Sequence, residues 1–472
     1  MICYLFPPLG GMAVPAVQRV VKFVRGMAGS HWDPVILTLR VDLYEPYLER
    51  EEKYLREIPA SAEVVRTGRV MLLKTIISAI QRLRGRGQPP VSGTAEAPPP
   101  STPPAPAAPP PAAGSKGALQ RFKDALTGAV QTPDPFMGWL PVAFLEGRRT
   151  IGQRGIACIY ATGSPWTSLL VGALLKKSTG LPLVLDFRDP WTTNPYRMHF
   201  HPARRWIEGR LETFVVNSAD AVIANTRGLR DEFRARYPRL PSERFDVIYN
   251  CVENERPLPR IALRAGGAEP VRLAHAGFLY GPRDPLLLLR AMAKRRQRES
   301  PGGARDLILD LIGPIDVSYP IADKLAELGL TDLVHVHGPV PHAMCQDMLV
   351  ASSALLLLQP GTMTQLPSKL FEYVSHGKPI LTLAMPGSET YTFAAEQLGS
   401  LVADCDDEEA IVRTLDELIA QVRAGQGPDI DRWEAAMAQF RPHTITSRLL
   451  HTFDTVTALT SRRSGAIGGA HA

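Results

Sequence analysis

Short apolar runs alternate with amphipathic helical patterns along most of the chain, in two successive series. The first series of expected strands comprises Ile2–Phe6, Val35–Leu39, Ala62–Arg66, Ala157–Tyr160, Leu183–Phe187, Ala221–Ala224 and Asp246–Tyr249. Helices are expected among them at Val14–Met27, Trp166–Lys177 and Gly228–Tyr237. Because strands and helices take turns, this series predicts a parallel, doubly wound sheet with helices on both faces.

The second series begins near residue 271 and has the same character. Its expected strands are Val271–Ala276, Leu307–Ile312, Val334–His337, Ala354–Leu358, Pro379–Leu383 and Ser400–Ala403, and its expected helices are Pro285–Arg296, Ile321–Leu328, His342–Ser352, Ser368–His376 and Asp407–Val422. The fold class predicted is therefore α/β, with two Rossmann-like domains facing a cleft. Ligands of such sheets bind at the carboxyl ends of the strands.

The expected domain boundaries follow from these two series. We expect an N-terminal domain over residues 1–255, a C-terminal domain over 256–440, a helix over 441–459 that packs back on the N-terminal domain, and a disordered tail over 460–472. Residues 88–117 are mostly Pro, Ala, Gly and Ser, which predicts a disordered insertion in the N-terminal domain.

Composition restricts the choice of partner and compartment. The formal charge of +6 on 472 residues favours anionic partners such as nucleoside diphosphates or an anionic membrane surface, and no basic and aromatic pattern indicates nucleic acid. The five cysteines are scattered and include no C-x-x-C pair, as is typical of a reducing cytosol. No signal peptide or transmembrane run is apparent.

One segment beside the Pro-rich insertion has a basic amphipathic pattern. In Val70–Arg86 the apolar positions share a helical face, and Lys74, Arg82, Arg84 and Arg86 bring positive charge with no acidic residue. The pattern fits a helix lying on the inner face of a membrane, and it equally fits an ordinary packed helix with a solvated face.

The most informative segment is residues 367–383. Pro367 and Ser368 suit a helix start, with Ser368 supplying a capping oxygen, and Lys369 adds a cation beside free backbone N–H groups. Glu372 follows one turn later, and Gly377 ends the helix. A carboxylate for ribose hydroxyls next to a diphosphate site describes a nucleotide-sugar pocket.

In order and spacing, this segment and others resemble retaining glycosyltransferases of family 4, which have the GT-B fold. The other matching segments are Phe6–Gly11, Val17–Phe23, Ala161–Pro165, Leu185–Trp191 and Gly277–Pro285. The resemblance implies a nucleoside diphosphate sugar as co-substrate, no cofactor, no metal, and front-face substitution assisted by the departing phosphate.

On the donor side, the resemblance implies that Gly277 opens the phosphate loop and that Arg283 neutralises the diphosphate together with Lys369. The family often carries Arg at the position of Phe278, and it carries a first Glu at the position of Thr364. Because of the departure at Phe278, neutralisation of the donor phosphates would depend on Arg283 and Lys369. Glu372 matches the second Glu of the family's motif.

On the acceptor side, the candidates lie in loops that follow the expected strands. Gly10 and Gly11 would allow close approach of a phosphate or sugar, although a plain βα turn is the alternative. The further candidates are Thr162, Gly163 and Asn194, with Arg188 and Asp189 as catalytic or sugar-contacting residues. A mutual ion pair is the equal alternative for Arg188 and Asp189.

Histidine pairs at 199 and 201 and at 335 and 337 have strand spacing, but the neighbouring sequence adds no carboxylate or cysteine. We therefore expect no metal site. The function predicted is transfer of a sugar to a glycan or lipid-linked acceptor, in cell-surface polysaccharide biosynthesis. The alternatives are a non-catalytic GT-B protein that binds nucleotide sugar or glycan, and a GT-B sugar-nucleotide epimerase.

Overall fold

The computed structural model describes residues 1–10, 13–71, 128, 131–194, 197–198, 200–252, 256–263, 266, 269–298 and 305–468, with Val14, Pro15 and 461–468 as backbone only. The Pro-rich insertion, most of Val70–Arg86, Gly11 and His199 lie outside these residues. Within them, no helix is both long enough and apolar enough to cross a membrane.

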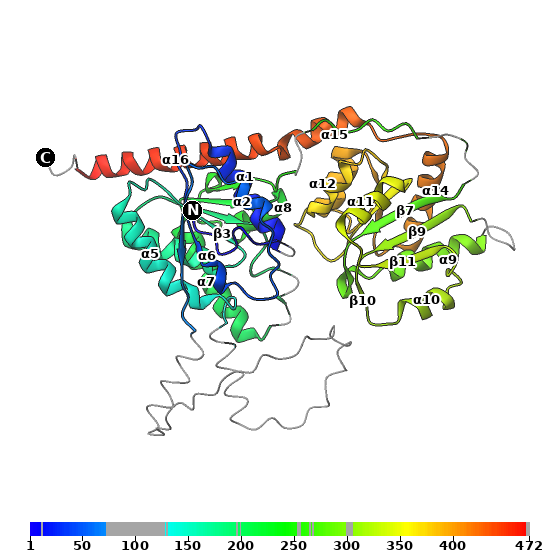
Figure 1. The fold of residues 1–472 in the computed structure, drawn as a ribbon, viewed down its shortest axis with the longest axis horizontal. Coiled ribbons are helices and arrows are strands. Elements are labelled where there is room, and N and C mark those ends of the chain that lie inside the picture. The colour runs from blue at the N-terminus through cyan, green and yellow to red at the C-terminus, as the bar shows by residue number, and fades with distance from the viewer. Residues whose placement is uncertain are drawn as a thin grey trace, which may run out of the picture.

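The N-terminal unit is built on parallel strands (Figure 1). Its strands are β1 (Val35–Leu39), β2 (Glu63–Thr67), β3 (Ile159–Gly163), β4 (Leu183–Phe187), β5 (Ala221–Ala224) and β6 (Phe245–Val247), paired as β1-β2 and as β3-β4-β5-β6. Every side chain of β3, β4 and β5 is buried, as expected for a sheet covered on both faces.

The first expected strand, Ile2–Phe6, is not formed as such. Ile2 makes isolated parallel bridges to Leu37 on β1 and Ala161 on β3, so it joins the two strand groups. Pro7 and Pro8 follow at once, and because proline has no N–H to donate, the ladder cannot continue through them.

Helices pack on both faces of these strands. They are α1 (Val14–Met27), α2 (Lys53–Arg56), α5 (Leu140–Gln153), α6 (Thr167–Thr179), α7 (Pro202–Ser218) and α8 (Arg227–Arg236), with short 3-10 turns at Val41–Leu43, Met137–Trp139 and Ser242–Arg244. The sequence analysis did not assign α5 and α7. The apolar residues of α7 are interrupted by Arg and Glu, some of which form buried ion pairs.

The C-terminal unit has a six-stranded parallel sheet in the order β11-β9-β7-β12-β13-β14. The strands are β7 (Val271–Ala276), β9 (Leu307–Ile312), β11 (Val334–Gly338), β12 (Ala354–Gln359), β13 (Ile380–Ala384) and β14 (Leu401–Asp404), with a small pair β8 (Leu279–Tyr280) and β10 (Ile315–Asp316). The helices are α9 (Leu286–Arg298), α10 (Ile321–Glu327), α11 (His342–Ala351), α12 (Ser368–Val374), α13 (Glu389–Thr392), α14 (Glu408–Arg423) and α15 (Ile430–Met437), with short turns at Gly281–Arg283, Phe393–Leu398 and Ala438–Phe440. Both sheets confirm the predicted doubly wound α/β fold class.

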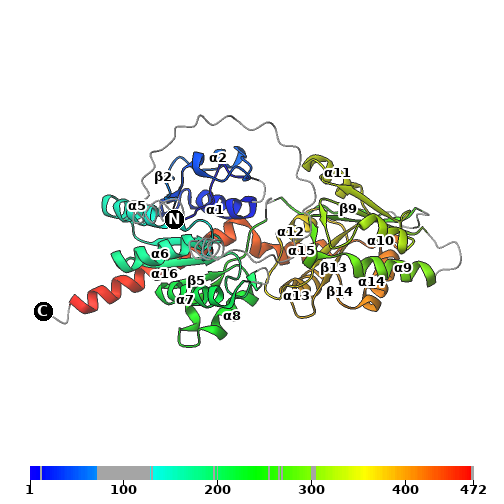
Figure 2. The ribbon, with the colours of Figure 1, turned by 90° about the horizontal axis from the view of Figure 1, so that it is seen from below.

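The chain crosses between the two units twice, and the crossings touch. The Val252 N–H on the first donates to the Phe440 carbonyl on the second at 3.0 Å. The last helix, α16 (Pro442–Gly468), then runs back along the N-terminal unit beside α1 (Figures 1 and 2). Its Ile445, Leu449 and Phe453 share a core with Phe23 of α1, and the helix continues past residue 460, where the sequence suggested a disordered tail.

Candidate functional site

The carboxyl end of β7 brings two candidate donor-site residues, Gly277 and Lys369, next to His275. A Cβ added at Gly277 would lie 3.3 Å from His275 Nε2 and 3.3 Å from Lys369 Cε. The absence of a side chain at Gly277 therefore lets the lysine of α12 reach the end of β7. Gly313 lies against the same turn, because a Cβ there would come 2.4 Å from the Gly277 carbonyl oxygen.

His275 is a buried histidine that the sequence analysis missed. Its Nδ1 lies 2.9 Å from the Leu356 carbonyl, so the proton sits on Nδ1, while the buried Nε2 has no hydrogen-bond partner among the described residues. Burial lowers the pKa of His275 to about 4, with the Leu356 carbonyl bond opposing the shift and the charges of Lys369 and Arg283 adding to it. The imidazole is thus neutral at physiological pH and presents a lone pair beside two cations.

This geometry predicts a specific pH dependence of stability. The pKa of His275 is about 4 when folded and 6.5 ordinarily, so the unfolded chain binds the extra proton between these values. The free energy of unfolding should fall as pH drops through that window, by up to about 1.4 kcal/mol per pH unit. Urea unfolding at pH 7 and pH 5 measures it. His275→Gln should show a shallower fall; an equal fall would contradict the assignment.

Arg283 ends the 3-10 turn Gly281–Arg283, three residues before α9, and its guanidinium reaches the carboxyl end of β12. Its Nη2 donates to Gln359 Oε1 at 2.8 Å, and it lies over the Tyr280 ring at 5.7 Å. Its Nε is buried without a partner among the described residues. An unused N–H on a fixed guanidinium is suited to an incoming anionic oxygen.

Helix α12 carries the remaining donor candidates, with one correction. Pro367 occupies the N-cap and Ser368 is the first helical residue, so the predicted serine cap is wrong and no side chain caps this helix. Lys369 Nζ lies 3.5 Å from Glu372 Oε2, and Gln346 of α11 donates to Glu372 Oε1 at 2.8 Å. Glu372 therefore contacts two polar side chains, and ribose hydroxyls could replace them as its hydrogen-bond donors.

Arg188 and Asp189 follow β4 and lie at the junction of the two units. The Nε2 of Gln365, three residues before α12, lies 3.4 Å from Asp189 Oδ1. Burial raises the pKa of Asp189 and lowers that of Arg188, and each charge opposes the shift of the other. Arg188 Nε is buried without a partner among the described residues. The loop after β4 thus meets the segment that leads to the donor candidates.

The other acceptor-side candidates lie differently. The Thr162 hydroxyl donates to Asp186 Oδ2 at 2.9 Å inside the core, so its side chain is already committed. The Gly163 carbonyl accepts from the Arg188 N–H at 2.9 Å, which fixes the loop. The Asn194 N–H donates to the Trp191 carbonyl at 3.4 Å, and a Cβ at Gly10 would come 2.7 Å from Glu51 Cβ. The backbone N–H groups of Thr162 and Gly10 are also bonded, to the Ile2 carbonyl at 3.2 Å and to the Glu49 carbonyl at 2.9 Å.

Two contacts between the units were not predicted. The Thr226 hydroxyl, which caps α8, donates to the Thr364 carbonyl, so residue 364 contributes a backbone group here. The Glu389 carboxylate accepts from the Gly228 N–H at 3.0 Å and the Arg227 N–H at 3.3 Å, at the positive end of α8. No sequence signal points to a partner this distant.

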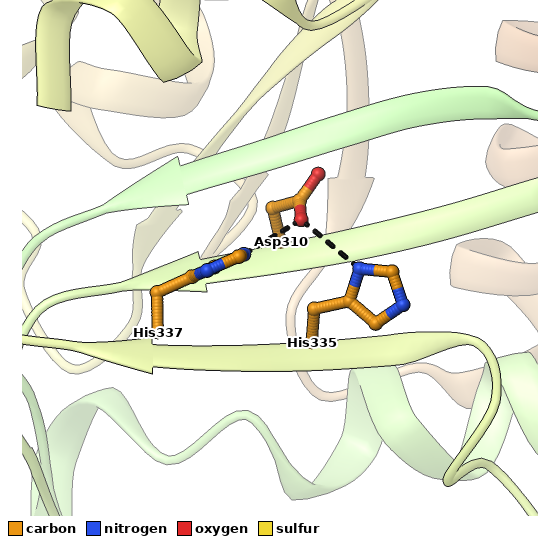
Figure 3. A group of neighbouring side chains, drawn as sticks. All are labelled: Asp310, His335 and His337. Carbon is orange, nitrogen blue, oxygen red and sulfur yellow. Dashed lines mark hydrogen bonds and ion pairs between the residues drawn. The ribbon is translucent and has the colours of Figure 1, made fainter. Parts of the chain in front are cut away.

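The structure supplies a carboxylate for one histidine pair. Asp310 on β9 lies beside His335 and His337 on the neighbouring strand β11, 3.4 Å from His335 Nδ1 and 2.8 Å from His337 Nε2 (Figure 3). The sequence analysis overlooked Asp310 because it lies on another strand. These three residues could hold a metal ion by geometry. However, Arg272 Nη2 lies 2.8 Å from both Asp310 oxygens, so the carboxylate charge is already matched.

Comparisons with known proteins agree with a fold of two α/β units. A family model described as Glycosyltransferase Family 4 matches residues 102–256, about a third of the chain. The D-inositol 3-phosphate glycosyltransferase 1 of Catenulispora acidiphila is 28% identical over 238 residues, 48% of this chain and 56% of that protein. The chain thus spans little more than half the length of this curated relative.

Two solved structures share the fold along almost the whole chain. HepE from Anabaena, in complex with UDP, has a TM-score of 0.55 at 13% identity and covers 96% of this chain and 99% of its own. The sucrose-phosphate synthase of Thermosynechococcus elongatus has a TM-score of 0.55 at 16% identity, with 97% and 98% covered. The fold is that of the GT-B glycosyltransferases, as predicted.

Proposed function

We propose that this protein transfers a sugar from a nucleoside diphosphate sugar to a glycan or lipid-linked acceptor, with retention of configuration at the anomeric carbon. The observation that carries the proposal is the convergence of Lys369, Arg283 and neutral His275 at the side-chain-free Gly277. Two fixed cations at the carboxyl edge of a parallel sheet match a diphosphate leaving group.

In the donor pocket each residue has one task. Lys369 and Arg283 stabilise the negative charge that develops on the leaving diphosphate. Electrostatic stabilisation of this kind is usually the largest single contribution to catalysis. Glu372 accepts hydrogen bonds from the ribose hydroxyls after exchanging its contacts with Lys369 and Gln346. Gly277 and the backbone at Pro367 and Ser368 allow the phosphates to approach closely.

The acceptor and the transferred sugar lie toward the N-terminal unit. Arg188 and Asp189 contact the sugar at the junction, next to Gln365. The loops at Gly10 and Gly11 and at Thr162 and Gly163, together with Asn194, hold the acceptor. Among the residues that the structure describes, no side chain is assigned as a nucleophile. The departing phosphate therefore assists front-face substitution, and closure of the units keeps water from the donor.

The setting we propose is the assembly of cell-surface polysaccharide at the cytoplasmic face of a membrane. The net charge of +6 and the basic pattern of Val70–Arg86 support contact with an anionic surface, where each basic residue contributes about 1 kcal/mol. A soluble glycan and a lipid-linked glycan offered as acceptors in parallel assays test the setting, and transfer to the soluble glycan alone would remove the membrane from it.

The direct test is a thermal-shift screen over UDP, GDP, ADP and TDP and their sugars, followed by a transfer assay with the ligand found. A ligand at a hundredfold over its Kd stabilises the folded state by about 2.7 kcal/mol. UDP is the first to try, because HepE was solved with it. Binding without transfer would favour the non-catalytic alternative, which the departures from the family pattern at Thr364 and Phe278 keep open. Conversion of the sugar nucleotide in the absence of an acceptor would favour the epimerase.

Glu372 provides a prediction of its own. Glu372→Ala should weaken nucleotide binding by about 1.5–3 kcal/mol, because a charged acceptor of ribose hydrogen bonds is lost. Isothermal titration of the folded variant with the nucleotide from the screen measures this. Asp323→Ala on α10 removes a carboxylate elsewhere in the same unit and serves as the control. Unchanged affinity in Glu372→Ala would exclude Glu372 from the donor pocket.

A further inference from the structure

A basic cavity lies where the chain crosses between the two units. Its volume is about 830 Å³, and its walls come from α1, α2, the first crossing at Arg256 and Pro257, and the start of α16. Figures 1 and 2 show α1 running beside α16, with α2 close to α1. None of its lining residues belongs to the proposed donor pocket.

The charge of this cavity is strongly one-sided. Lys22, Arg25, Lys53 and Arg256 line it, against the single carboxylate of Glu57. Arg25 lies 3.5 Å from Glu57, an exposed contact that neutralises only one of the four cations. Lys53 pairs at 2.9 Å with a second carboxylate, that of Glu51, which lies outside the lining. An excess of positive charge in a recess concentrates anions there.

The wall contributed by α16 carries an unpaired hydroxyl. Thr446 is 2% exposed, and its Oγ1 is buried with no hydrogen-bond partner among the described residues. It packs against Gly26 of α1, where a Cβ would come 2.4 Å from this oxygen. A buried hydroxyl without a partner costs stability, and rotation of the Thr446 side chain away from Gly26 would turn it toward a ligand in the cavity that this residue lines.

The first turn of α16 adds to the same wall. Pro442 and His443 of this turn line the cavity, and the N–H groups of the first helical residues after the proline have no acceptor within the helix. The positive end of the dipole of this long helix therefore lies at the wall of the recess. Cations, a hydroxyl donor and a helix start together are the groups that bind phosphate.

The position of the cavity connects it to both crossings. Lys22 Nζ donates to the Val252 carbonyl at 2.8 Å, and the Val252 N–H donates to Phe440 on the other crossing. Arg256, which follows Val252 on the first crossing, and Pro442, which follows Phe440, both line the cavity. A ligand held here touches the segments about which the two units would rotate.

We propose that this cavity binds a ligand carrying one or more phosphate groups, and that its occupancy favours one relative orientation of the two units. The ligand is either a free phosphorylated metabolite or the phosphate headgroup of a lipid. The proposal does not depend on the donor pocket, and it assigns Arg25, Lys53, Arg256 and Thr446 to ligand binding.

Calorimetric titration of the full chain with inorganic pyrophosphate tests the site. The titration is made in the Lys369→Ala, Arg283→Ala background, so that the proposed donor pocket does not contribute. Saturable binding with one site is expected. Arg25→Gln with Lys53→Gln should weaken it at least tenfold, and Thr446→Val, which keeps the side-chain shape, should weaken it several-fold.

The matched control removes the same charge elsewhere. Arg148→Gln with Arg149→Gln, both exposed on α5, should change the affinity less than twofold. Equal losses in the two double variants would show a non-specific charge effect and overturn the proposal, and so would the absence of saturable binding.

Co-sedimentation with vesicles separates the two sources of phosphate. Phosphatidylcholine vesicles with and without phosphatidic acid are compared in the same background and in the Arg25→Gln, Lys53→Gln variant. Binding to phosphatidic acid that this variant loses assigns a lipid headgroup. Pyrophosphate binding without vesicle binding assigns a free metabolite, and vesicle binding that both proteins share equally excludes this cavity as the lipid site.

Discussion

Replacing both Lys369 and Arg283 with alanine is expected to reduce the rate of sugar transfer by about 10³-fold or more, because both cations act on the charge that develops on the leaving diphosphate. Affinity for the nucleoside without phosphates should change little, since Glu372 and not these cations would hold the ribose. Turnover and nucleoside titration in the same variant separate the two effects.

The control for this experiment is Lys294→Ala with Arg298→Ala on α9. These exposed residues of the same unit form ion pairs with Glu409, so the variant removes the same charge away from the end of β7. Its transfer rate should stay within about twofold of the parent. Transfer that survives in the Lys369, Arg283 variant would show that the diphosphate is bound elsewhere.

Arg19→Met should destabilise the fold by about 3–5 kcal/mol, the largest effect expected of a residue outside the site. Arg19 is 1% exposed, and it bonds both Asp186 oxygens at 2.9 and 2.7 Å as well as the carbonyls of Ile248 and Tyr249. The methionine would leave Asp186 charged and buried. Urea unfolding measures the loss, and Arg40→Met, at an exposed pair with Asp42, should cost less than about 1 kcal/mol.

The pH dependence of this variant provides a second readout. Burial alone would raise the pKa of Asp186, but the charge and hydrogen bonds of Arg19 outweigh it and lower the pKa below 3.8. The pair therefore stabilises the fold above about pH 4, and this contribution is lost as pH falls through the lowered pKa. Adding Asp186→Asn to Arg19→Met should recover part of the loss, and no recovery would place the effect of Arg19 in its carbonyl contacts alone.

The sequence predicted the sheets well because their strands are continuous apolar runs. Leu183–Phe187 and Val271–Ala276 match β4 and β7 in full, since strands buried on both faces need no polar alternation. The prediction of a full strand at Ile2–Phe6 was wrong, because apolar residues alone do not form a ladder of hydrogen bonds when prolines follow.

The candidate site was predictable only where residues close in sequence act together. Lys369 and Glu372 lie one turn apart, so their contact follows from helix geometry. Three other features depend on residues that are distant in sequence. They are the neutral state of His275, the contact between Gln365 and Asp189, and the contacts of Asp310 with His335 and His337. No local pattern encodes such contacts.

The return of α16 has a consequence for how this protein is made. The N-terminal unit borrows Ile445, Leu449, Phe453 and Val456 from the last helix to cover Phe23 and Tyr160. A ribosome therefore releases the N-terminal unit with an uncovered apolar strip on α1 and must complete the whole C-terminal unit before the strip is closed. The N-terminal unit therefore completes its folding only after the C-terminal unit has been synthesised, although their sheets are separate. A chimaera that exchanges the C-terminal unit must keep α16 together with the N-terminal unit that it covers.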